Sequence, residues 1–434
     1  MKIAIIGTGY VGLPTGVGFA ELGNQVACID YDKSKIDMLR AGHVTLFEDG
    51  LDELLQKNIA AGRIIFTTSM ADAVPNADIV ILAVGTPPHP ETGAADMKYI
   101  HAAATELAQY LTGYTVIATK STVPVGTGDK IEEIIRTQNP TADFDVVSLP
   151  EFLREGFAVY DFFNPDRIIV GANTERARNV LRELYAPFAE KSQILFVNRR
   201  SSETIKYASN AFLAIKIHYI NEMANFCEAT GADINEVSRG MGLDTRIGNR
   251  FLNAGPGYGG SCFPKDTSAM AYMADENGVD MTLIKAAIRG NRARKTMMAQ
   301  RIMDAVSGIE NPKIAVLGLA FKNGTDDCRE SPAIEIINDL LPHNVQITAF
   351  DPQAMETAKK VLPAGAITYA PDIYSAVSGA DVLAILTEWD DFRALDLARV
   401  SELMHHKVIV DCRNLLNPDD AESHGFKYSC IGRK

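Results

Sequence analysis

Short apolar runs recur along the chain, and each is nearly continuous instead of alternating with polar residues. Four lie near the amino terminus and four near the carboxyl terminus, at residues 2–7, 25–30, 77–84, 114–121, 313–318, 344–351, 380–386 and 406–411. Such runs are typical of strands buried on both faces of a parallel sheet. Helical patterns separate them, as at residues 33–40 and 332–341. The pattern therefore predicts an α/β protein with two doubly wound parallel-sheet domains.

A different pattern lies between the two sets of strands. Residues 201–230 contain no proline or glycine, and Gly231 supplies a helix stop signal. A helix of that length would measure about 45 Å at a rise of about 1.5 Å per residue. We expect it to join the two α/β units and to bury one face against a second copy of the chain, although a coiled hinge would have the same pattern. The predicted domains are residues 1–197, 198–305 and 306–434.

Composition limits the classes of function. The chain has 434 residues and a net charge of -13, which argues against nucleic acid or an anionic membrane as the main partner. No apolar stretch reaches the roughly 18 residues that a membrane helix needs. Six cysteines without C-x-x-C spacing favour reduced thiols. We therefore expect a cytoplasmic protein, and we expect no metal site.

A dinucleotide-binding fingerprint, Gly7-Thr-Gly9-Tyr10-Val11-Gly12, follows the first predicted strand. Glycines at these positions allow a tight turn and a close approach of the backbone to a pyrophosphate at the positive end of the next helix, which makes the first domain Rossmann-like. Asp30 ends the following strand, where its carboxylate can accept hydrogen bonds from ribose hydroxyls and repel a 2′-phosphate. The sequence therefore predicts NAD as the cofactor, although Lys35 nearby weakens the preference over NADP.

Two further strands of this sheet end in loops that contain threonine, Val84-Gly-Thr86 and Lys120-Ser-Thr122. Ligands bind at the carboxyl ends of strands in open α/β sheets, so both threonine hydroxyls could donate to the cofactor. They could also cap the helices that follow, and the two roles are compatible.

The segment from Gly255 to Asp266, Gly-Pro-Gly-Tyr-Gly-Gly-Ser-Cys-Phe-Pro-Lys-Asp, carries the most specific chemistry. It places Cys262 in a glycine-rich turn for which packing alone gives little reason. A thiolate beside a nicotinamide is suited to oxidising an aldehyde through a covalent thioester. For Cys262 alone, a buried and unreactive thiol is the simpler alternative.

Two pairs of polar residues, each pair four positions apart, add further groups. Glu151 and Glu155 follow a predicted strand, and on the first turns of a helix they would point the same way. Lys206 and Asn210 lie on the predicted long helix. Alone, the acids could complement a helix dipole and the second pair could be solvated. Together with the cysteine segment they supply a nucleophile, acid/base groups and oxyanion donors.

These motifs resemble those of the UDP-glucose/GDP-mannose dehydrogenase family, and the likeness covers nearly the whole chain. It is carried by the fingerprint, Ser121-Thr-Val-Pro, Pro150-Glu-Phe-Leu, Asn164-Pro-Asp-Arg, the helix with Lys206 and Asn210, Arg246-Ile-Gly-Asn-Arg-Phe, Gly259-Gly-Ser-Cys-Phe-Pro-Lys-Asp, Gly318-Leu-Ala-Phe-Lys322 and Asp327-Cys-Arg329-Glu-Ser. The resemblance implies oxidation of UDP-glucose to UDP-glucuronate with two NAD in succession, through a cysteine thiohemiacetal and thioester. It also implies that the second sheet holds the uridine diphosphate.

The resemblance further implies roles for single residues. Asp266 takes the hydroxyl proton through a water, Lys206 and Asn210 stabilise the oxyanion, and Cys262 is the nucleophile. Glu151 or Glu155 is the base for hydrolysis. The other expected contacts to the cofactor are Thr122 (also counted as catalytic), Glu155, Lys265 and Arg329. The other expected contacts to the substrate are Phe152, Leu153, Arg246 (reaching across a subunit boundary), Phe251, Leu252, Asn253, Ala254, Gly255, Tyr258, Gly259 and Lys322.

Three alternatives remain. A dehydrogenase of UDP-N-acetyl-hexosamines would share most motifs, although Arg246-Ile-Gly-Asn-Arg-Phe and Ser261-Cys-Phe-Pro are closer to the glucose branch. A dehydrogenase of the 6-phosphogluconate type would need neither Cys262 nor a second sheet. A catalytically silent sensor of NAD or nucleotide sugar should lack the nucleophile or one of its partners, and the sequence has all of them.

Overall fold

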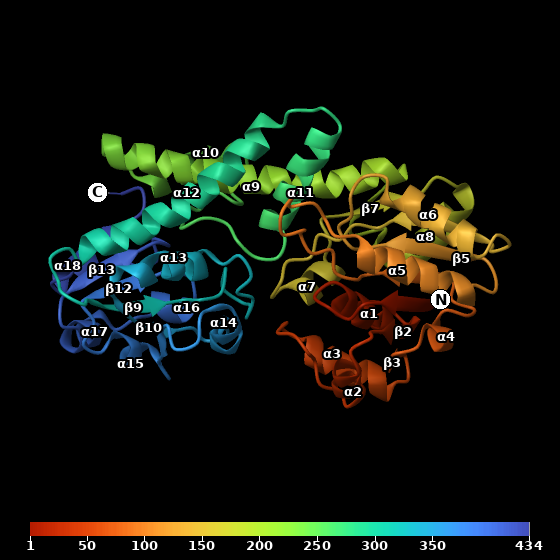
Figure 1. The fold of residues 1–434 in the computed structure, drawn as a ribbon, viewed down its shortest axis with the longest axis horizontal. Coiled ribbons are helices and arrows are strands. Elements are labelled where there is room, and N and C mark those ends of the chain that lie inside the picture. The colour runs from red at the N-terminus through yellow and green to blue at the C-terminus, as the bar shows by residue number, and fades with distance from the viewer. Residues whose placement is uncertain (434) are drawn as a thin grey trace. The chain divides into compact units, whose positions relative to one another are not determined.

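The chain is described by a computed structural model that covers residues 1–433. It divides into two compact units. The first comprises Met1–Ser209 with Asp275–Asn277, and the second comprises Asn210–Ala274 with the chain from Gly278 onward. Each unit is built on one sheet, and Figure 1 marks the elements along the chain. The functional division into three domains stays a prediction.

The first unit contains an eight-stranded sheet in the order β3-β2-β1-β4-β5-β6-β7-β8. Its strands are β1 (Lys2–Ile6), β2 (Gln25–Ile29), β3 (Ile64–Thr67), β4 (Ile79–Leu82), β5 (Thr115–Thr119), β6 (Phe144–Ser148), β7 (Arg167–Gly171) and β8 (Gln193–Val197). Neighbouring strands pair in parallel except β6 and β7, which are antiparallel. The doubly wound sheet is confirmed, and the antiparallel pair is a feature that the sequence analysis did not anticipate.

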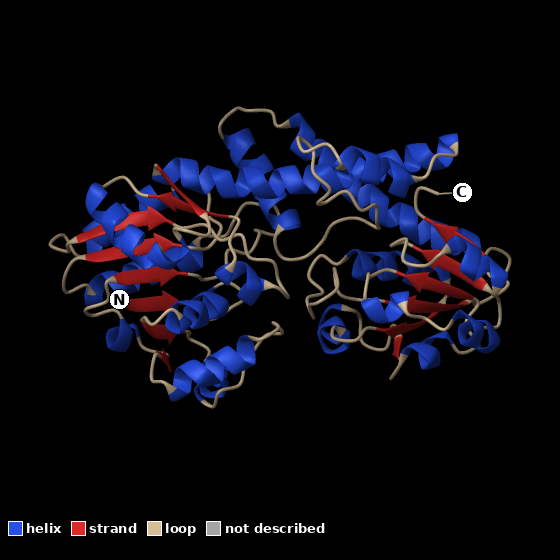
Figure 2. Cartoon of the chain, turned by 180° about the vertical axis from the view of Figure 1, so that it is seen from behind, coloured by secondary structure: helices blue, strands red, loops and turns tan. Residues whose placement is uncertain are grey.

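The second unit contains a six-stranded sheet in the order β11-β10-β9-β12-β13-β14, and all its pairs are parallel. Its strands are β9 (Lys313–Leu317), β10 (Gln346–Phe350), β11 (Thr368–Tyr369), β12 (Val382–Ile385), β13 (Val408–Asp411) and β14 (Lys427–Cys430). Figure 2 shows the strands of each sheet in red with helices on both sides. In both sheets the strand order reverses beside the first strand, between β1 and β4 and between β9 and β12. Ligands of open α/β sheets bind at such switch points.

Both faces of each sheet are buried, as the continuous apolar runs predict. In β1, Ile3 and Ile5 belong to one core cluster, and Ala4 and Ile6 belong to another on the opposite face. The alternation follows from the two-residue period of strand side chains. The second sheet likewise separates two core clusters.

The helices cover these faces. Those of the first unit are α1 (Gly12–Glu21), α2 (Lys33–Arg40), α3 (Leu51–Ala60), α4 (Met70–Ala73), α5 (Lys98–Leu107), α6 (Thr127–Gln138), α7 (Ala158–Phe163) and α8 (Glu175–Leu184), with 3-10 turns at Ala108–Tyr110 and Ala186–Phe188. Those of the second unit are α10 (Ile234–Gly242), α12 (Thr282–Ala305), α13 (Pro332–Leu340), α14 (Met355–Val361), α15 (Ile373–Val377), α16 (Asp390–Arg393), α17 (Leu397–Leu403) and α18 (Pro418–Ser423), with a 3-10 turn at Leu341–His343. Helices α9 (Arg199–Thr230) and α11 (Phe263–Glu276) contribute residues to both units. Across residues 1–433, no helix is long and apolar enough to cross a membrane.

The predicted long helix is confirmed as α9, which has 32 residues and is drawn in Figure 1. It ends at Gly231, whose φ of 80° suits glycine and whose N–H donates to the carbonyl of Cys227 at 2.8 Å. In the first unit its beginning is held by Glu203, whose buried carboxylate accepts the N–H groups of Gly126 and Gly128 at 2.6 and 2.8 Å. Close packing against β7 is possible because a Cβ at Gly171 would collide with Ser202 of α9. These contacts fix where the next turns of α9 present their side chains.

Candidate active site

The glycine fingerprint forms the turn between β1 and α1 in the first unit. Gly7 has a φ of 101°, and a Cβ there would lie 2.5 Å from the carbonyl oxygen of Ala83. A Cβ at Gly12 would collide with the carbonyl of Gly7. Around Gly9, in contrast, no atom lies within 4 Å of the position that a Cβ would take. Gly7 and Gly12 therefore serve the turn, and Gly9 leaves room for a ligand to approach the backbone at the helix amino terminus, as a pyrophosphate requires. Tyr10 and Val11 complete the turn and are partly exposed.

Asp30 lies at the end of β2, beside this turn. One of its carboxylate oxygens accepts the N–H of Thr8 at 3.0 Å and the hydroxyl of Thr8 at 2.7 Å, and the ammonium of Lys35 lies 3.4 Å away. Burial raises the pKa of Asp30, but the hydrogen bonds from Thr8 and Asp32 and the charge of Lys35 outweigh burial and lower it. Asp30 is therefore held ionised next to the fingerprint, where an NAD ribose would lie.

The two threonine-containing loops meet at the carboxyl ends of β4 and β5. The hydroxyl of Thr86 donates to the carbonyl of Thr122 at 2.9 Å, and the hydroxyl of Ser121 donates to the carbonyl of Val84 at 2.6 Å. Neither threonine caps the next helix, because the cap residues of α5 and α6 are Met97 and Gly126. The capping alternative is therefore wrong, and the loops are joined to each other at the carboxyl ends of β4 and β5 instead.

Lys206 and Glu151 form a buried ion pair in the first unit. The ammonium of Lys206 donates to a carboxylate oxygen of Glu151 at 3.0 Å and to its carbonyl oxygen at 2.7 Å, and both side chains are 5% exposed. The same ammonium lies 5.2 Å from the ring centroid of Phe152. A solvated helix face, the simpler alternative for Lys206, is excluded by this burial.

The expected helical arrangement of Glu151 and Glu155 is wrong. Residues 151–157 form a loop, and α7 begins only at Ala158. The carboxylate of Glu151 turns back to accept the N–H of Leu153 at 2.6 Å, which competes with helix formation. Gly156 then takes a φ of 81°. Glu155 therefore lies in the loop, directly before Gly156, and does not share a helix face with Glu151.

The loop is held by Glu48, a residue that the sequence analysis did not identify. Its buried carboxylate accepts the N–H groups of Gly156 and Ala158 at 2.7 and 2.9 Å. Glu48 lies 108 residues before Gly156 in the chain, in a loop with no distinctive motif. No local signal points to this role.

Asn210, one turn after Lys206 on α9, belongs to the second unit. Its amide donates to the carboxylate of Asp266 at 2.6 Å, and Asp266 is fully buried. The other oxygen of that carboxylate is paired with the ammonium of Lys265. The structure therefore brings together Asn210, Lys265 and Asp266, three residues that the sequence analysis selected.

Cys262 precedes α11 directly, and its carbonyl accepts the N–H of Asp266 at 2.8 Å in the first turn of that helix. Its sulfur lies 3.6 Å from the hydroxyl of Ser261, and the residue is partly exposed. The positive end of a helix dipole stabilises a thiolate, so this position suits a nucleophile. The other five cysteines, among residues 1–433, are buried.

The expectation that packing gives little reason for the glycine-rich turn is wrong. A Cβ at Gly259 would collide with the carbonyl of Glu330, and a Cβ at Gly260 would lie 2.7 Å from the ring of Phe321. Gly260 also has a φ of 81° and donates its N–H to the carbonyl of Arg329 at 3.0 Å. The glycines therefore allow the segment before Cys262 to lie directly against the 321–330 loop.

Three buried polar residues, which the sequence analysis missed, hold the first half of this segment. Asn221 accepts the N–H of Gly255 at 2.8 Å, and Arg294 donates to the carbonyl of Gly255 at 3.0 Å. Asn291 accepts the N–H of Tyr258 at 2.8 Å and donates to its carbonyl at 2.9 Å. These residues lie on α9 and α12, more than thirty positions from the segment they hold.

The expected substrate residues occupy varied positions. Leu252, Ala254, Gly255, Tyr258 and Gly259 are buried, Phe152, Leu153 and Lys322 are partly exposed, and Asn253 and Arg246 are exposed. Arg246 is paired with Asp244 at 2.6 Å. Phe251 has a φ of 64°, which is unusual for an aromatic residue. Arg329, an expected cofactor contact, is exposed and paired with Asp327 at 2.8 Å. Their roles in binding stay predictions.

The second sheet repeats the turn of the first, but the aspartate beside the turn is fully buried. Gly318, after β9, has a φ of 101°, like Gly7. Asp351 occupies the position of Asp30, but it is fully buried and accepts the N–H groups of Leu319 and Ala320 at 2.7 and 3.1 Å. A nucleotide at this sheet must therefore be bound by other groups.

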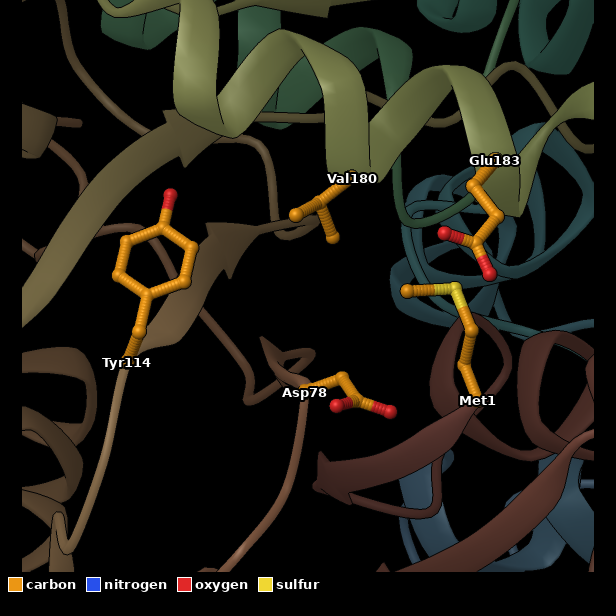
Figure 3. Close-up of a pocket in the computed structure, with 5 residues that line it drawn as sticks. All are labelled: Met1, Asp78, Tyr114, Val180 and Glu183. Carbon is orange, nitrogen blue, oxygen red and sulfur yellow. The ribbon is translucent and has the colours of Figure 1, made fainter.

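Two further features lie away from these residues. A hollow at the amino ends of β1, β4 and β5, shown in Figure 3, is lined by Met1, Asp78, Tyr114, Val180 and Glu183. A carboxylate oxygen of Asp381 lies within hydrogen-bond distance of one ring nitrogen of His405, at 2.9 Å, and one of His406, at 2.7 Å. Among residues 1–433, these three side chains are close enough together to hold a metal ion. Within its own sheet each lies at the amino ends of the strands, whereas the turns at Gly7 and Gly318 lie at the carboxyl ends.

A turn of this geometry serves a dinucleotide, which defines the class of an NAD-dependent dehydrogenase. In the second unit, a partly exposed cysteine directly precedes a helix.

Comparison with known proteins identifies the family. Residues 1–189 match the NAD-binding domain of the UDP-glucose/GDP-mannose dehydrogenase family, residues 200–293 match its central domain, and residues 315–418 match its UDP-binding domain. The chain belongs to this family. The family assignment confirms NAD as the cofactor and a nucleotide sugar as the small-molecule substrate.

Several relatives are similar over their full length. The chain is 49% identical to a UDP-glucose 6-dehydrogenase of Rhizobium meliloti (strain 1021), covering 100% of both chains, and 46% identical to UDP-glucose 6-dehydrogenase YwqF of Bacillus subtilis (strain 168), covering 100% and 98%. Its fold matches the structure of a UDP-glucose dehydrogenase from Pyrobaculum islandicum with a TM-score of 0.93, 37% identity and coverage of 100% and 98%. It also matches the structure of a UDP-D-ManNAc dehydrogenase from Pyrococcus horikoshii, with a TM-score of 0.88, 27% identity, and coverage of 100% of this chain and 99% of that one.

Substitution of Asp30 by asparagine should relax the choice of cofactor. The amide keeps the acceptor for Thr8 but removes the charge that repels a 2′-phosphate. Because a charge-assisted contact contributes about 1.5–3 kcal/mol, the preference for NAD over NADP should fall about ten- to a hundredfold, measured as the ratio of kcat/KM values. Asp37→Ala, which alters an exposed carboxylate of α2, is the control and should keep the preference. An unchanged preference in Asp30→Asn would remove Asp30 from the cofactor site.

Proposed function

We propose that this protein oxidises the C6 hydroxyl of UDP-glucose to a carboxylate and so forms UDP-glucuronate. The observation that carries the proposal is the position of Cys262 at the start of α11, four residues before the buried contact of Asp266 with Asn210. The four-residue spacing supports a nucleophile and a proton acceptor that act together, one helical turn apart. Relatives at 49% and 46% identity carry the name UDP-glucose 6-dehydrogenase, whereas the acetyl-hexosamine relative is 27% identical, which favours glucose over an acetylated sugar.

The residues divide the reaction into two oxidations. Asp266 accepts the proton of the C6 hydroxyl through a water, while Lys206 and Asn210 donate hydrogen bonds to the oxygen that becomes negative. Two NAD molecules in succession supply the chemistry of hydride acceptance, and the fingerprint, Asp30 and the 84–86 and 120–122 loops would hold them. The product of the first oxidation is an aldehyde.

Cys262 converts this aldehyde to an acid without releasing it. Its thiolate sulfur forms a bond to the aldehyde carbon, and the carbonyl electrons move to oxygen to give a thiohemiacetal. Loss of the hydroxyl proton, and of hydride from the same carbon to the second NAD, would restore the carbonyl as a thioester. Water then adds to that carbonyl, the carbon–sulfur bond breaks, and the products are a carboxylate and the free thiol. Covalent capture keeps the reactive aldehyde bound between the two oxidations.

Glu151 is the stronger candidate for the base that activates the hydrolytic water. Its carboxylate accepts a hydrogen bond from the ammonium of Lys206, whereas Glu155 lies next to Gly156, where the loop turns. A carboxylate beside an oxyanion donor can take a proton from water close to the carbon under attack. Glu155 then remains for the cofactor side of the site. Lys322, in the second unit, contributes a cation for the diphosphate.

We also propose that the protein acts in the cytoplasm as a homodimer through α9. Phe212, Tyr219 and Phe226 recur every seven residues on this helix and are 62%, 45% and 60% exposed. Seven residues are nearly two helical turns, so the three rings form one stripe. Exposed aromatic stripes of this kind are costly in water and mark interfaces. The family resemblance makes a second copy of the chain the natural occupant.

Replacing Cys262 by serine should separate the two oxidations. Without the thiolate, steady-state formation of UDP-glucuronate should fall at least about a thousandfold, because removing a covalent nucleophile removes the whole second half of the reaction. Rapid mixing should still show up to one NADH per site, and intact mass spectrometry should show either no adduct or a stable ester. Cys430→Ala, which changes a buried thiol of β14, is the control. Uronate formation by Cys262→Ser at the wild-type rate would exclude the thioester.

Introducing charge into the α9 stripe should dissociate the dimer. Phe212→Glu with Phe226→Glu would place two carboxylates on each facing helix, and the mass in solution should fall from two chains to one, measured by light scattering or sedimentation. Tyr99→Glu alters an aromatic residue of α5 that is 49% exposed, and it should leave the dimer intact. A double variant that remains dimeric would place the interface elsewhere.

A further inference from the structure

Lys120 is a buried cation next to the residues assigned above. It directly follows β5, and its N–H donates to the carbonyl of Leu82 in β4 at 2.9 Å. β5 pairs with β6 so that Thr119 lies opposite Ser148, and Glu151 follows Ser148 by three residues. Lys120 and Glu151 therefore leave neighbouring strands at the same edge of the sheet. Lys120 is only 7% exposed.

This lysine differs from the other buried lysines in having no partner. Lys206 is paired with Glu151, and Lys295 is paired with Glu335 at 2.5 Å. For the ammonium of Lys120, no ion pair or hydrogen bond is formed with any residue from 1 to 433. Burying a lysine to this degree without an ion pair is unfavourable, so a protein keeps one where it serves a function.

The charged groups that act on Lys120 are the two members of the Glu151–Lys206 pair. Burial lowers the pKa of Lys120 to about 8, the negative charge of Glu151 opposes this shift, and the positive charge of Lys206 adds to it. These groups come from the loop after β6 and from α9. β4 and the loop after it, residues 79–88, contain no charged residue. Lys120, Glu151 and Lys206 thus form one group of two cations and one carboxylate.

The arrangement answers a difficulty in the reaction. Lys206 is needed at the oxygen of the sugar, yet in this structure two of its three ammonium donors are used on Glu151. When Lys206 turns toward the reacting oxygen, the buried carboxylate of Glu151 loses its cation, which is a large cost in a site of low dielectric. A second cation nearby removes most of that cost.

We propose that Lys120 is a positioning residue. It compensates the charge of Glu151 when Lys206 turns away, and so allows Lys206 to act on the sugar oxygen. The inference rests on the proposed function, in which Lys206 stabilises the oxyanion and Glu151 activates water. Lys120 does not touch the reacting atoms. Its effect requires only that it stay charged, so arginine should replace it and methionine should not.

The first test compares Lys120→Met and Lys120→Arg with the wild type in turnover of UDP-glucose with NAD. Lys120→Met should lower kcat about ten- to a hundredfold and change KM for UDP-glucose less than about threefold, because the lost charge acts on the transition state and not on binding. Lys120→Arg should restore most of kcat. Lys130→Met removes an exposed lysine of α6 and is the matched control, with no expected effect. A Lys120→Met enzyme with wild-type kcat, or one in which only KM rises, would overturn the proposal.

The pH profile supplies a readout that a merely structural role would not move. In the wild type, kcat should fall as the pH rises above about 8, where Lys120 loses its proton. In Lys120→Arg this decline should move upward by at least one pH unit, because guanidinium stays protonated. An identical alkaline decline in both enzymes would assign it to another group and contradict the proposal.

Stability gives a test that does not depend on the reaction. The pKa of Lys120 is near 8 in the folded chain and 10.5 ordinarily, so its burial penalty is fully present below pH 8. Between these pH values the unfolded chain binds a proton that the folded chain has released, so the wild type gains stability as the pH rises. Lys120→Met should therefore melt at a higher temperature than the wild type at pH 7, and the gap should narrow toward pH 10. Equal melting at both pH values would show that Lys120 is not an unpaired buried cation.

These outcomes also separate the inference from the proposed function. If the wild type gives no NADH with UDP-glucose, or only one NADH per sugar, the proposed function fails while the melting comparison still reports on Lys120. If the wild type gives two NADH per sugar and Lys120→Met turns over normally, only the role of Lys120 fails.

Discussion

The positions of Lys206 and Asn210 depend on one uninterrupted helix, which buries these two polar side chains one turn apart. Lys206 and Asn210 of α9 are each held by a carboxylate from another segment, Glu151 from the loop after β6 and Asp266 from α11. Removing one member of such a buried pair typically costs about 3–5 kcal/mol, because the other is left uncompensated. The helix can present both residues because nothing between Arg199 and Thr230 breaks it.

The residues buried around Lys206 and Asn210 differ in polarity from those buried on the faces of the two sheets. Both sheets bury apolar side chains on both faces, while the strand ends and α9 bury lysines, carboxylates and amides. Such groups add little to stability compared with apolar residues of the same size, but they are the groups that move protons and stabilise negative charge. Lys120 stands out among the buried lysines of residues 1–433, since its ammonium forms neither an ion pair nor a hydrogen bond there.

Much of this arrangement could be predicted from local patterns. The parallel strands, α9, its end at Gly231, and the fingerprint follow from hydrophobic periodicity and glycine positions, which depend on neighbouring residues only. The loop at Glu151 could not be predicted in this way, because a side-chain contact to Leu153 and the distant Glu48 decide its shape.

The cysteine segment, residues 255–266, combines features that local patterns predict with features that they do not. Its proposed chemistry rests on Cys262 and Asp266, but its glycines also serve packing against Glu330 and Phe321, about sixty to seventy positions further along the chain. Asn221, Asn291 and Arg294 hold the same segment from two helices, and no motif marks them. Sequence patterns therefore indicate which groups are candidates for the reaction, while long-range contacts decide how these groups are held.

The central claim is a four-electron oxidation completed on one protein. The most direct test is the number of NADH molecules formed per UDP-glucose consumed by the purified full-length chain, with both quantified in the same reaction. We predict a ratio near two with UDP-glucuronate as the product. A ratio near one, with the aldehyde released, would contradict the account, because Cys262 would then have no reaction to perform.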